Sequence, residues 1–319
     1  MMLPRRSFLA AGLALPGLAS AADLHWQERS LVGFGTTLRL QAGAADARRL
    51  TGALDAAVRA LREVETAMNL FQPDSEVSRL NREGRLARPS AHLRAVLGVA
   101  QQVSAASHGA FDVTVQPLWQ LYEQARVAGW LPSPQAVQAA RARVGWQHLR
   151  VDERAVSFDR PGMAITLNGI AQGYAADVAR DTLRAHGVAH ALVDAGEFAA
   201  LGTNRRAQPW QVGIEDPHTP GQLLDAVALQ GRCIATSSDL RGAFTADRRH
   251  HQLFDPATGD SPPALSSVSV VAERAVLADA LTKVMFVAGP AGIPALARQW
   301  GVDVRWVDKA GARSSVVPL

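Results

Sequence analysis

Lysine and cysteine are scarce in this 319-residue chain. Of its 33 lysine and arginine residues, only Lys283 and Lys309 are lysines, and Cys233 is the only cysteine. A single cysteine excludes an intramolecular disulfide and a lipid-bearing N-terminal cysteine, so the fold must rely on its apolar core. The strong bias toward arginine makes Lys283 conspicuous.

The N-terminus has an apolar run too short to cross a bilayer. Arg5 and Arg6 precede the apolar stretch from Phe8 to Leu18, and the small residues Ala19-Ser20-Ala21 follow. This order is typical of an export signal, and the run is well below the ~20 residues of a membrane span. We therefore assign residues 1–22 to a cleaved signal and residues 23–319 to one domain, with no membrane span.

The segment Arg5-Arg6-Ser7-Phe8-Leu9 also resembles a twin-arginine signal. Such signals export proteins that have already folded, whereas a general secretory signal remains the alternative. Either signal predicts a soluble periplasmic protein.

Charge gives no indication of a nucleic-acid partner. The net charge of +4 falls to +2 without Arg5 and Arg6, and no basic stripe alternates with aromatic residues. The hydrophobic content of 48% is ordinary for a globular protein. We expect no binding to nucleic acid.

Hydrophobic spacing predicts helices mixed irregularly with strands. Helical spacing covers residues 45–69 and 91–106, a stretch ending at Gly145, a stretch from Gly169 to His186-Gly187, and residues 277–288 before Gly289-Pro290. Strand-like runs cover residues 188–196, 210–215, 226–235, 252–254 and 266–272. This irregular order favours an α+β fold over a doubly wound sheet.

Asp279 and Thr282 lie three residues apart within the last expected helix. A carboxylate and a hydroxyl on nearly the same helical face are hard oxygen ligands suited to Mg²⁺. An acidic residue near a helix N-terminus also serves commonly as a cap. The pair alone therefore leaves both interpretations open.

Four segments together resemble one enzyme family. They are FQPDSEVSRLN (71–81), FDVTVQPL (111–118), LNGIAQGYAAD (167–177) and LADALTKVMFVAG (277–289). Their order and residue types resemble the flavin transferases of the ApbE family, from about Gly33 to the end of the chain. The resemblance implies layered mixed sheets with flanking helices, and transfer of FMN from FAD to a threonine of another protein with Mg²⁺.

The resemblance implies metal ligation by Asp279, by the Gly169 carbonyl and by Thr282. Lys283 stands where the family has its metal-binding threonine, and Thr282 lies one residue earlier. An ammonium cannot ligate Mg²⁺. Three alternatives remain: Thr282 substitutes, Lys283 neutralises the pyrophosphate itself, or the site holds no metal.

The resemblance also implies a set of flavin contacts. Thr166 replaces a family aspartate, Gln172 replaces a lysine, and Phe34 replaces a methionine. The full set is Phe34, Ala110, Phe111, Asp112, Thr166, Gln172 and Leu253.

The segment from His250 to Gly259 resembles the family's histidine-containing strand. Counting back from Asp255 places the family histidine on Gln252, with His251 displaced by one residue. We expect His251 to act as the catalytic base that takes the proton of the incoming threonine. The alternative is a solvated histidine beside Arg248 and Arg249.

The resemblance further implies the partner. It would be an exported or membrane flavoprotein with an Asp-Gly-x-Thr/Ser-Gly-Ala-Thr acceptor motif. Two other functions remain open: an FAD pyrophosphatase, in which water replaces the threonine, and a non-catalytic periplasmic flavin-binding protein.

Overall fold

The computed structural model describes residues 24–318, so the expected signal lies outside the described residues. The helices are α1 (Ala47–Met68), α2 (Glu76–Glu83), α3 (Ala91–Ala106), α4 (Gln116–Ala128), α5 (Pro134–Arg141), α6 (Ala171–Ala185) and α7 (Ala275–Trp300). The strands are β1 (His25–Gly33), β2 (Thr36–Ala44), β3 (Arg85–Ala87), β4 (Leu149–Val151), β5 (Ala155–Phe158), β6 (His190–Asp194), β7 (Phe198–Leu201), β8 (Trp210–Glu215), β9 (Leu223–Leu229), β10 (Cys233–Ser238), β11 (Leu265–Ala272), β12 (Asp303–Asp308) and β13 (Arg313–Val316). The expected α+β class is confirmed.

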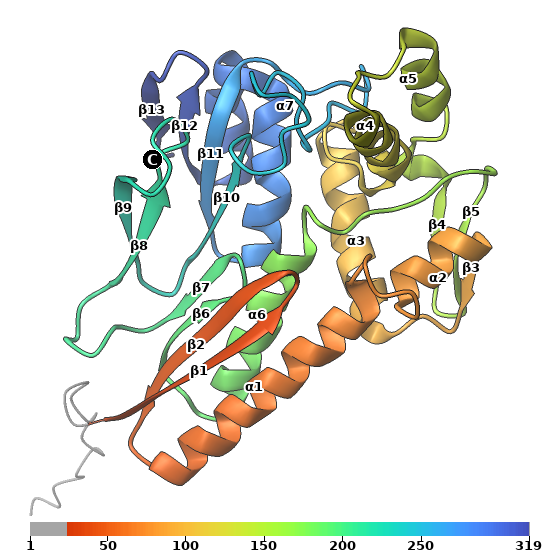
Figure 1. Ribbon diagram of the computed structural model, residues 1–319. Coiled ribbons are helices and arrows are strands. Elements are labelled where there is room, and N and C mark those ends of the chain that lie inside the picture. The colour runs from red at the N-terminus through yellow and green to blue at the C-terminus, as the bar shows by residue number, and fades with distance from the viewer. Residues whose placement is uncertain (1–23, 319) are drawn as a thin grey trace, which may run out of the picture.

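One large sheet organises the fold (Figure 1). Its strand order is β1-β2-β6-β7-β10-β11-β12-β13, and each neighbouring pair is antiparallel. The tight turn at Phe34-Gly35 joins β1 to β2, where Gly33 pairs with Thr36. This hairpin forms one edge of the sheet, and β13 forms the other.

Helices α1, α6 and α7 form a layer against the sheet. Helix α1 packs on α6, α6 packs on α7, and α7 packs on β10 and β11. The apolar face of α1, with Leu50, Leu54 and Leu61 buried, follows the helical period. Asp46 caps this helix by accepting from the backbone N–H of Arg48 at 2.8 Å.

The β8–β9 hairpin covers part of the opposite face of the sheet. Its buried residues Trp210, Val212 and Leu229 pack on Ile234 of β10 and Val271 of β11. Both faces of β11 are thus covered, and all its residues are buried. Burial on both faces explains why β11 has no charged side chains. Its only polar residues are the small serines Ser266, Ser267 and Ser269.

Cys233 lies at the start of β10 and is fully buried. The Arg180 guanidinium donates to its Sγ at 2.8 Å. Burial raises the pKa of the Cys233 thiol to about 12. The thiol therefore stays protonated inside the core.

A second region lies beside the helix layer. It contains the three-stranded sheet β3-β5-β4 and the helices α2, α3, α4 and α5 (Figure 1). Leu118, Tyr122 and Ala140 form a small core with Phe254, which belongs to the long connection between β10 and β11. This core anchors that connection next to α4.

The structure corrects several sequence-based boundaries. The run 226–235 is divided by a turn between β9 and β10, and the helix expected to end at Gly145 ends at Arg141. Residues 252–254 form no strand; only an isolated bridge joins Ala243 to His251. The helical stretch that was expected to end at Gly289 continues beyond a kink at this residue, where φ is 65°.

Among residues 24–318, α7 is the one helix with the length and apolarity of a membrane span. More than half of its 18-residue apolar window is buried inside the protein, and the helix packs against α3, α6 and the sheet. Asp279 and Lys283 lie within it. These contacts identify α7 as a core helix.

Candidate functional site

Three adjoining cavities meet at Asn168. The central cavity measures about 480 Å³ and lies among α6, β7, β8 and β10. The apolar cavity lies between residues 110–119 and 252–256, and the side cavity lies beside Phe34 and Phe71. Asn168 lines all three, while Lys283 and Leu253 line both the central and the apolar cavity.

The apolar cavity is built by the loop before α4. Gly109 has φ of 85°, and this turn directs Ala110 and Phe111 to the cavity. The Asp112 carboxylate accepts from Thr114 N–H at 2.7 Å and from Trp146 N–H at 2.9 Å. Burial raises the pKa of Asp112. The Asp112 carboxylate therefore holds this loop together, and the loop forms part of the wall of the apolar cavity.

Gln172 lies in the first turn of α6 and lines the central and side cavities. Gly196 has φ of 96°, and a Cβ at this position would lie 2.3 Å from Gln172 Nε2. Only glycine allows this close approach. The Gly196 turn therefore leaves space for the Gln172 amide.

The other predicted flavin contacts line the cavities in part through their backbone. Thr166 lines the apolar cavity, and its N–H donates to the Val113 carbonyl at 2.8 Å. Phe34 lines the side cavity with φ of 50°, and its N–H donates to Glu65 Oε1 at 2.8 Å. Both residues therefore sit on segments that hydrogen bonds fix in place.

Asp279 is buried between α7 and α6. The Lys283 ammonium forms an ion pair with Asp279 Oδ1 and also donates to the Asp279 carbonyl at 3.1 Å. The backbone N–H of Gly173 donates to Oδ2 at 3.1 Å. Both carboxylate oxygens therefore already have partners.

Thr282 is fully buried, and its hydroxyl is also bonded internally. It donates to the Asp279 carbonyl at 2.7 Å and lies 2.7 Å from the Ser237 hydroxyl. A Cβ built on Gly169 would lie 2.9 Å from Lys283 Cε, so the lysine stem lies across the Gly169 backbone. Lys283 thus occupies the space among the three residues that were predicted to ligate a metal.

These residues do not fit a divalent cation. An ammonium beside the only carboxylate of the set would repel the ion, and neither Asp279 oxygen is free. Within residues 24–318, no group of three or more His, Cys, Asp or Glu side chains is placed to hold a metal. The geometry therefore favours a site in which Lys283 supplies the positive charge.

Glu197 is a wall residue of the central cavity that sequence reasoning missed. It is buried, and its Oε2 accepts from Thr236 N–H at 3.0 Å. Burial, together with the negative charge of Asp279, raises the pKa of Glu197 well above its ordinary value. The cavity wall thus contains a carboxyl group that resists ionisation.

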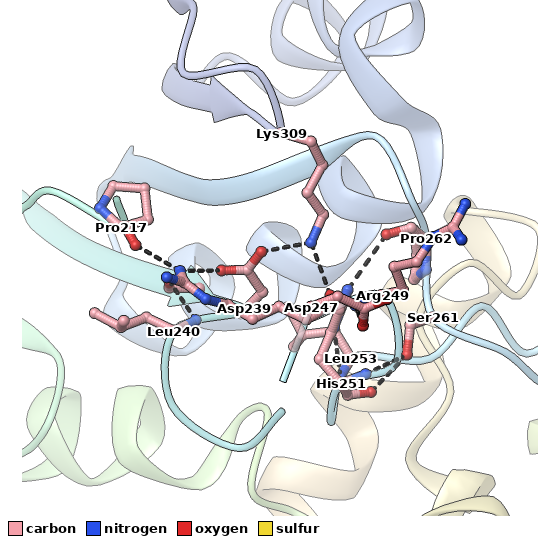
Figure 2. Close-up of polar contacts among 12 residues, drawn as sticks. Pro217, Asp239, Leu240, Asp247, Arg249, His251, Leu253, Ser261, Pro262 and Lys309 are labelled. Atoms are coloured by element: carbon pink, nitrogen blue, oxygen red, sulfur yellow. Dashed lines mark hydrogen bonds and ion pairs between the residues drawn. The ribbon is translucent and has the colours of Figure 1, made fainter. Parts of the chain in front are cut away.

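Figure 2 shows that His251 lies among polar groups of Leu253, Ser261 and Pro262. Its Nδ1 accepts from Leu253 N–H at 3.4 Å, and its Nε2 donates to the Pro262 carbonyl at 3.3 Å. The ring is fully buried against Phe286, and burial lowers its pKa to about 4. Its neighbour Gln252 lines the central and the apolar cavity.

A cluster next to His251 fixes the segment that carries Gln252 and Leu253 (Figure 2). The buried Asp239 carboxylate pairs with Lys309 and with Arg248, 3.3 Å away. Lys309 also donates to the Arg248 carbonyl at 2.9 Å. Of the two lysines in the chain, Lys283 therefore lines the cavities, whereas Lys309 belongs to the cluster that holds this segment.

The structure brings most of the predicted site residues to the cavities. These are Phe34, Ala110, Phe111, Asp112, Thr166, Gly169, Gln172 and Leu253. Asp279 and Thr282 lie buried behind Lys283, and His251 lies buried behind Gln252. Their predicted roles stay predictions. Asn168 was missed, although its place between Thr166 and Gly169 was a signal.

Comparison with known proteins gives consistent results. The chain matches the model of the ApbE family over residues 34–306. It is 32% identical over 296 residues to the FAD:protein FMN transferase of Vibrio cholerae serotype O1, covering 88% of this chain and 86% of that relative. It is 29% identical to the FAD:protein FMN transferase of Salmonella typhimurium, covering 87% of this chain and 83% of that relative.

Two solved structures have the same fold. The flavin transferase ApbE from Vibrio cholerae superposes with a TM-score of 0.77 at 27% identity, covering 92% of this chain and 97% of that chain. The ApbE protein from Thermotoga maritima superposes with a TM-score of 0.80 at 25% identity, covering 91% of this chain and 96% of that chain.

Proposed function

Because the chain belongs to the ApbE family, we propose that it transfers the FMN part of FAD to a threonine of another protein. The threonine hydroxyl oxygen forms a bond to the FMN phosphorus. The phosphoanhydride bond breaks, AMP leaves with the bridging oxygen, and the hydroxyl proton is released. The acceptor then carries FMN through a phosphoester.

The meeting of three cavities at Asn168 is the observation that carries this proposal. The central cavity of about 480 Å³ falls within the size range of ligand sites. The apolar cavity offers Phe111 and Trp119, which suit a flat aromatic ring system. Joined cavities of different polarity match a dinucleotide with two ring systems and a charged centre.

Lys283 lies where the central and apolar cavities join, because it lines both. The N-terminus of α6 begins at Ala171, next to Gly169 and Asn168. Positive charge and the positive end of a helix dipole both favour phosphate oxygens. We therefore assign the pyrophosphate to this junction and the rings to the cavities on either side.

Mg²⁺ is not part of the proposed reaction. Asp279, Thr282 and the Gly169 carbonyl were the expected ligands; the internal partners of the Asp279 carboxylate and the Thr282 hydroxyl support a reaction without the ion. The catalytic contribution then rests on positioning and on the positive charge of Lys283.

The proposed acceptor is an exported or membrane flavoprotein that bears an Asp-Gly-x-Thr/Ser-Gly-Ala-Thr motif. Intact-mass spectrometry of a soluble acceptor domain, incubated with residues 22–319 and FAD, tests the proposal. A mass gain of one FMN on the motif threonine, absent after its replacement by alanine, is the expected result. AMP formation without any acceptor gain would instead identify an FAD pyrophosphatase.

We also infer that residues 1–22 direct export to the periplasm. Fractionation followed by N-terminal sequencing checks this inference. The expected result is a soluble periplasmic protein that starts near Ala22, with precursor accumulating when Arg5 and Arg6 are both replaced by lysine. Full-length protein confined to the cytoplasm would contradict it.

A further inference from the structure

The ammonium of Lys283 is held as part of the protein scaffold. It pairs with Asp279 one helical turn earlier, and it donates to the Asp279 carbonyl at 3.1 Å. An ammonium has three N–H donors, and these contacts use two of them. The side chain keeps 16% of its surface exposed, toward two cavities that it lines.

The backbone around Lys283 is shaped to accept the lysine. A Cβ added at Gly169 would lie only 2.9 Å from Lys283 Cε. Any residue larger than glycine at this position would therefore displace the aliphatic part of the lysine side chain. Gly173 allows α6 to approach α7 closely, and its N–H occupies the second Asp279 oxygen. The position of the charge is therefore determined by α6 as well as by α7.

Charge complementarity indicates what Lys283 can bind. The lysine brings one positive charge to a cavity wall that also contains Glu197, with the buried Asp279 behind it. A divalent cation next to a fixed ammonium is disfavoured, whereas a phosphate oxygen next to it is favoured. The unused donor therefore suits an anion that arrives with the nucleotide.

We propose that Lys283 is a built-in cation that replaces a divalent metal, binds a pyrophosphate oxygen of FAD and makes the site metal-independent. This inference rests on the proposed function for the identity of the nucleotide. As a point charge, Lys283 holds the oxygen where negative charge increases as AMP leaves. No change in oxidation state and no additional reactant is involved.

The first test is the affinity for FAD, measured by flavin fluorescence with a chelator or with Mg²⁺. The wild-type affinity should be the same in both conditions. Lys283→Met should weaken FAD binding by about 10- to 100-fold, because a hydrogen bond to a charged group is lost. Riboflavin has no phosphate, so its affinity should not change; a purely structural effect would weaken both ligands.

The second test is Lys283→Thr, which removes the ammonium and frees Asp279 Oδ1. FAD binding should be weak with the chelator and should recover with Mg²⁺. Lys283→Arg keeps the positive charge and should retain metal-independent binding if the cavity accepts its volume. Arg59→Met is the matched control, because Arg59 is an exposed cation on α1 that lines none of the three cavities; it should bind FAD as the wild type does.

The outcomes separate this inference from the proposed function. Metal-independent FAD binding without FMN transfer to any acceptor would contradict the transferase and leave the role of Lys283 intact. FMN transfer that a chelator abolishes and Mg²⁺ restores would overturn the role of Lys283 and leave the transferase intact. Unchanged FAD affinity in folded Lys283→Met would also overturn it.

Discussion

The backbone N–H of Gly173 in α6 donates to Asp279 Oδ2 in α7 at 3.1 Å. A Cβ at Gly173 would lie 2.4 Å from the Ala275 carbonyl and 2.7 Å from Asp279 Cβ. Glycine is therefore required where these two helices touch. The same contact fixes the carboxylate that holds Lys283.

Gly173→Ala should separate α6 from α7 and destabilise the protein. We expect a loss of about 3 kcal/mol in the free energy of unfolding, at the upper end for overpacked cores. Urea denaturation measures the change. The matched control is Gly52→Ala in α1, where an added Cβ meets nothing within 4 Å. This variant should raise the free energy of unfolding by about 0.5–1 kcal/mol. Equal effects in the two variants would contradict the close contact.

Glu197→Gln should stabilise the protein at alkaline pH more than at acidic pH. The raised pKa of Glu197 means that the folded state binds this proton more tightly than the unfolded state. Stability is therefore greatest below the ordinary pKa of 4.5 and decreases as pH rises through the raised pKa. Glutamine keeps an acceptor for Thr236 N–H and cannot ionise. Thermal denaturation at pH 5 and pH 8 should give a larger difference from wild type at pH 8.

His251 should make the protein sensitive to acid. Its pKa is lowered from 6.5 to about 4, so the unfolded state binds this proton first as pH falls. The stability contribution is complete above pH 6.5 and is lost between pH 6.5 and about 4, on the order of 3 kcal/mol. NMR titration of the imidazole checks the pKa. A resonance that titrates near pH 6.5 would contradict a buried imidazole with hydrogen bonds at both ring nitrogens.

Gln172→Ala should weaken FAD binding with little effect on folding. The amide lines the central and side cavities. If FAD binds there as proposed, the loss of the amide removes neutral hydrogen bonds to the nucleotide. A decrease in affinity of about 3- to 10-fold is expected. Gln211→Ala is the control, because Gln211 is exposed on β8 and lines none of the three cavities. Fluorescence titration of both variants makes the comparison.

The sequence predicted the helices better than the large sheet. The apolar period of residues 45–69 and 91–106 corresponds to α1 and α3, because one buried face leaves a clear 3.6-residue pattern. Strands β1 and β2 were missed, since their pairing with each other and with β6 depends on residues far apart in sequence. Local patterns do not contain such pairings.

The site was predicted in outline, and its internal bonding was not. Resemblance located Gln172, Leu253 and the loop of Ala110 at the cavities. It did not indicate that Lys283 would take the Asp279 carboxylate, or that backbone groups would occupy both His251 nitrogens. These outcomes depend on which polar groups meet after α6 and α7 pack, and residue type alone does not fix that.

The buried Cys233 has a consequence for how the chain can mature. Its protonated thiol lies beside Arg180 inside the core, so the native state offers no thiolate to a disulfide catalyst. With no second cysteine in the sequence, folding to the native form involves no intramolecular disulfide. Folding is therefore indifferent to the redox state of its surroundings, and a reducing or an oxidising compartment yields the same molecule.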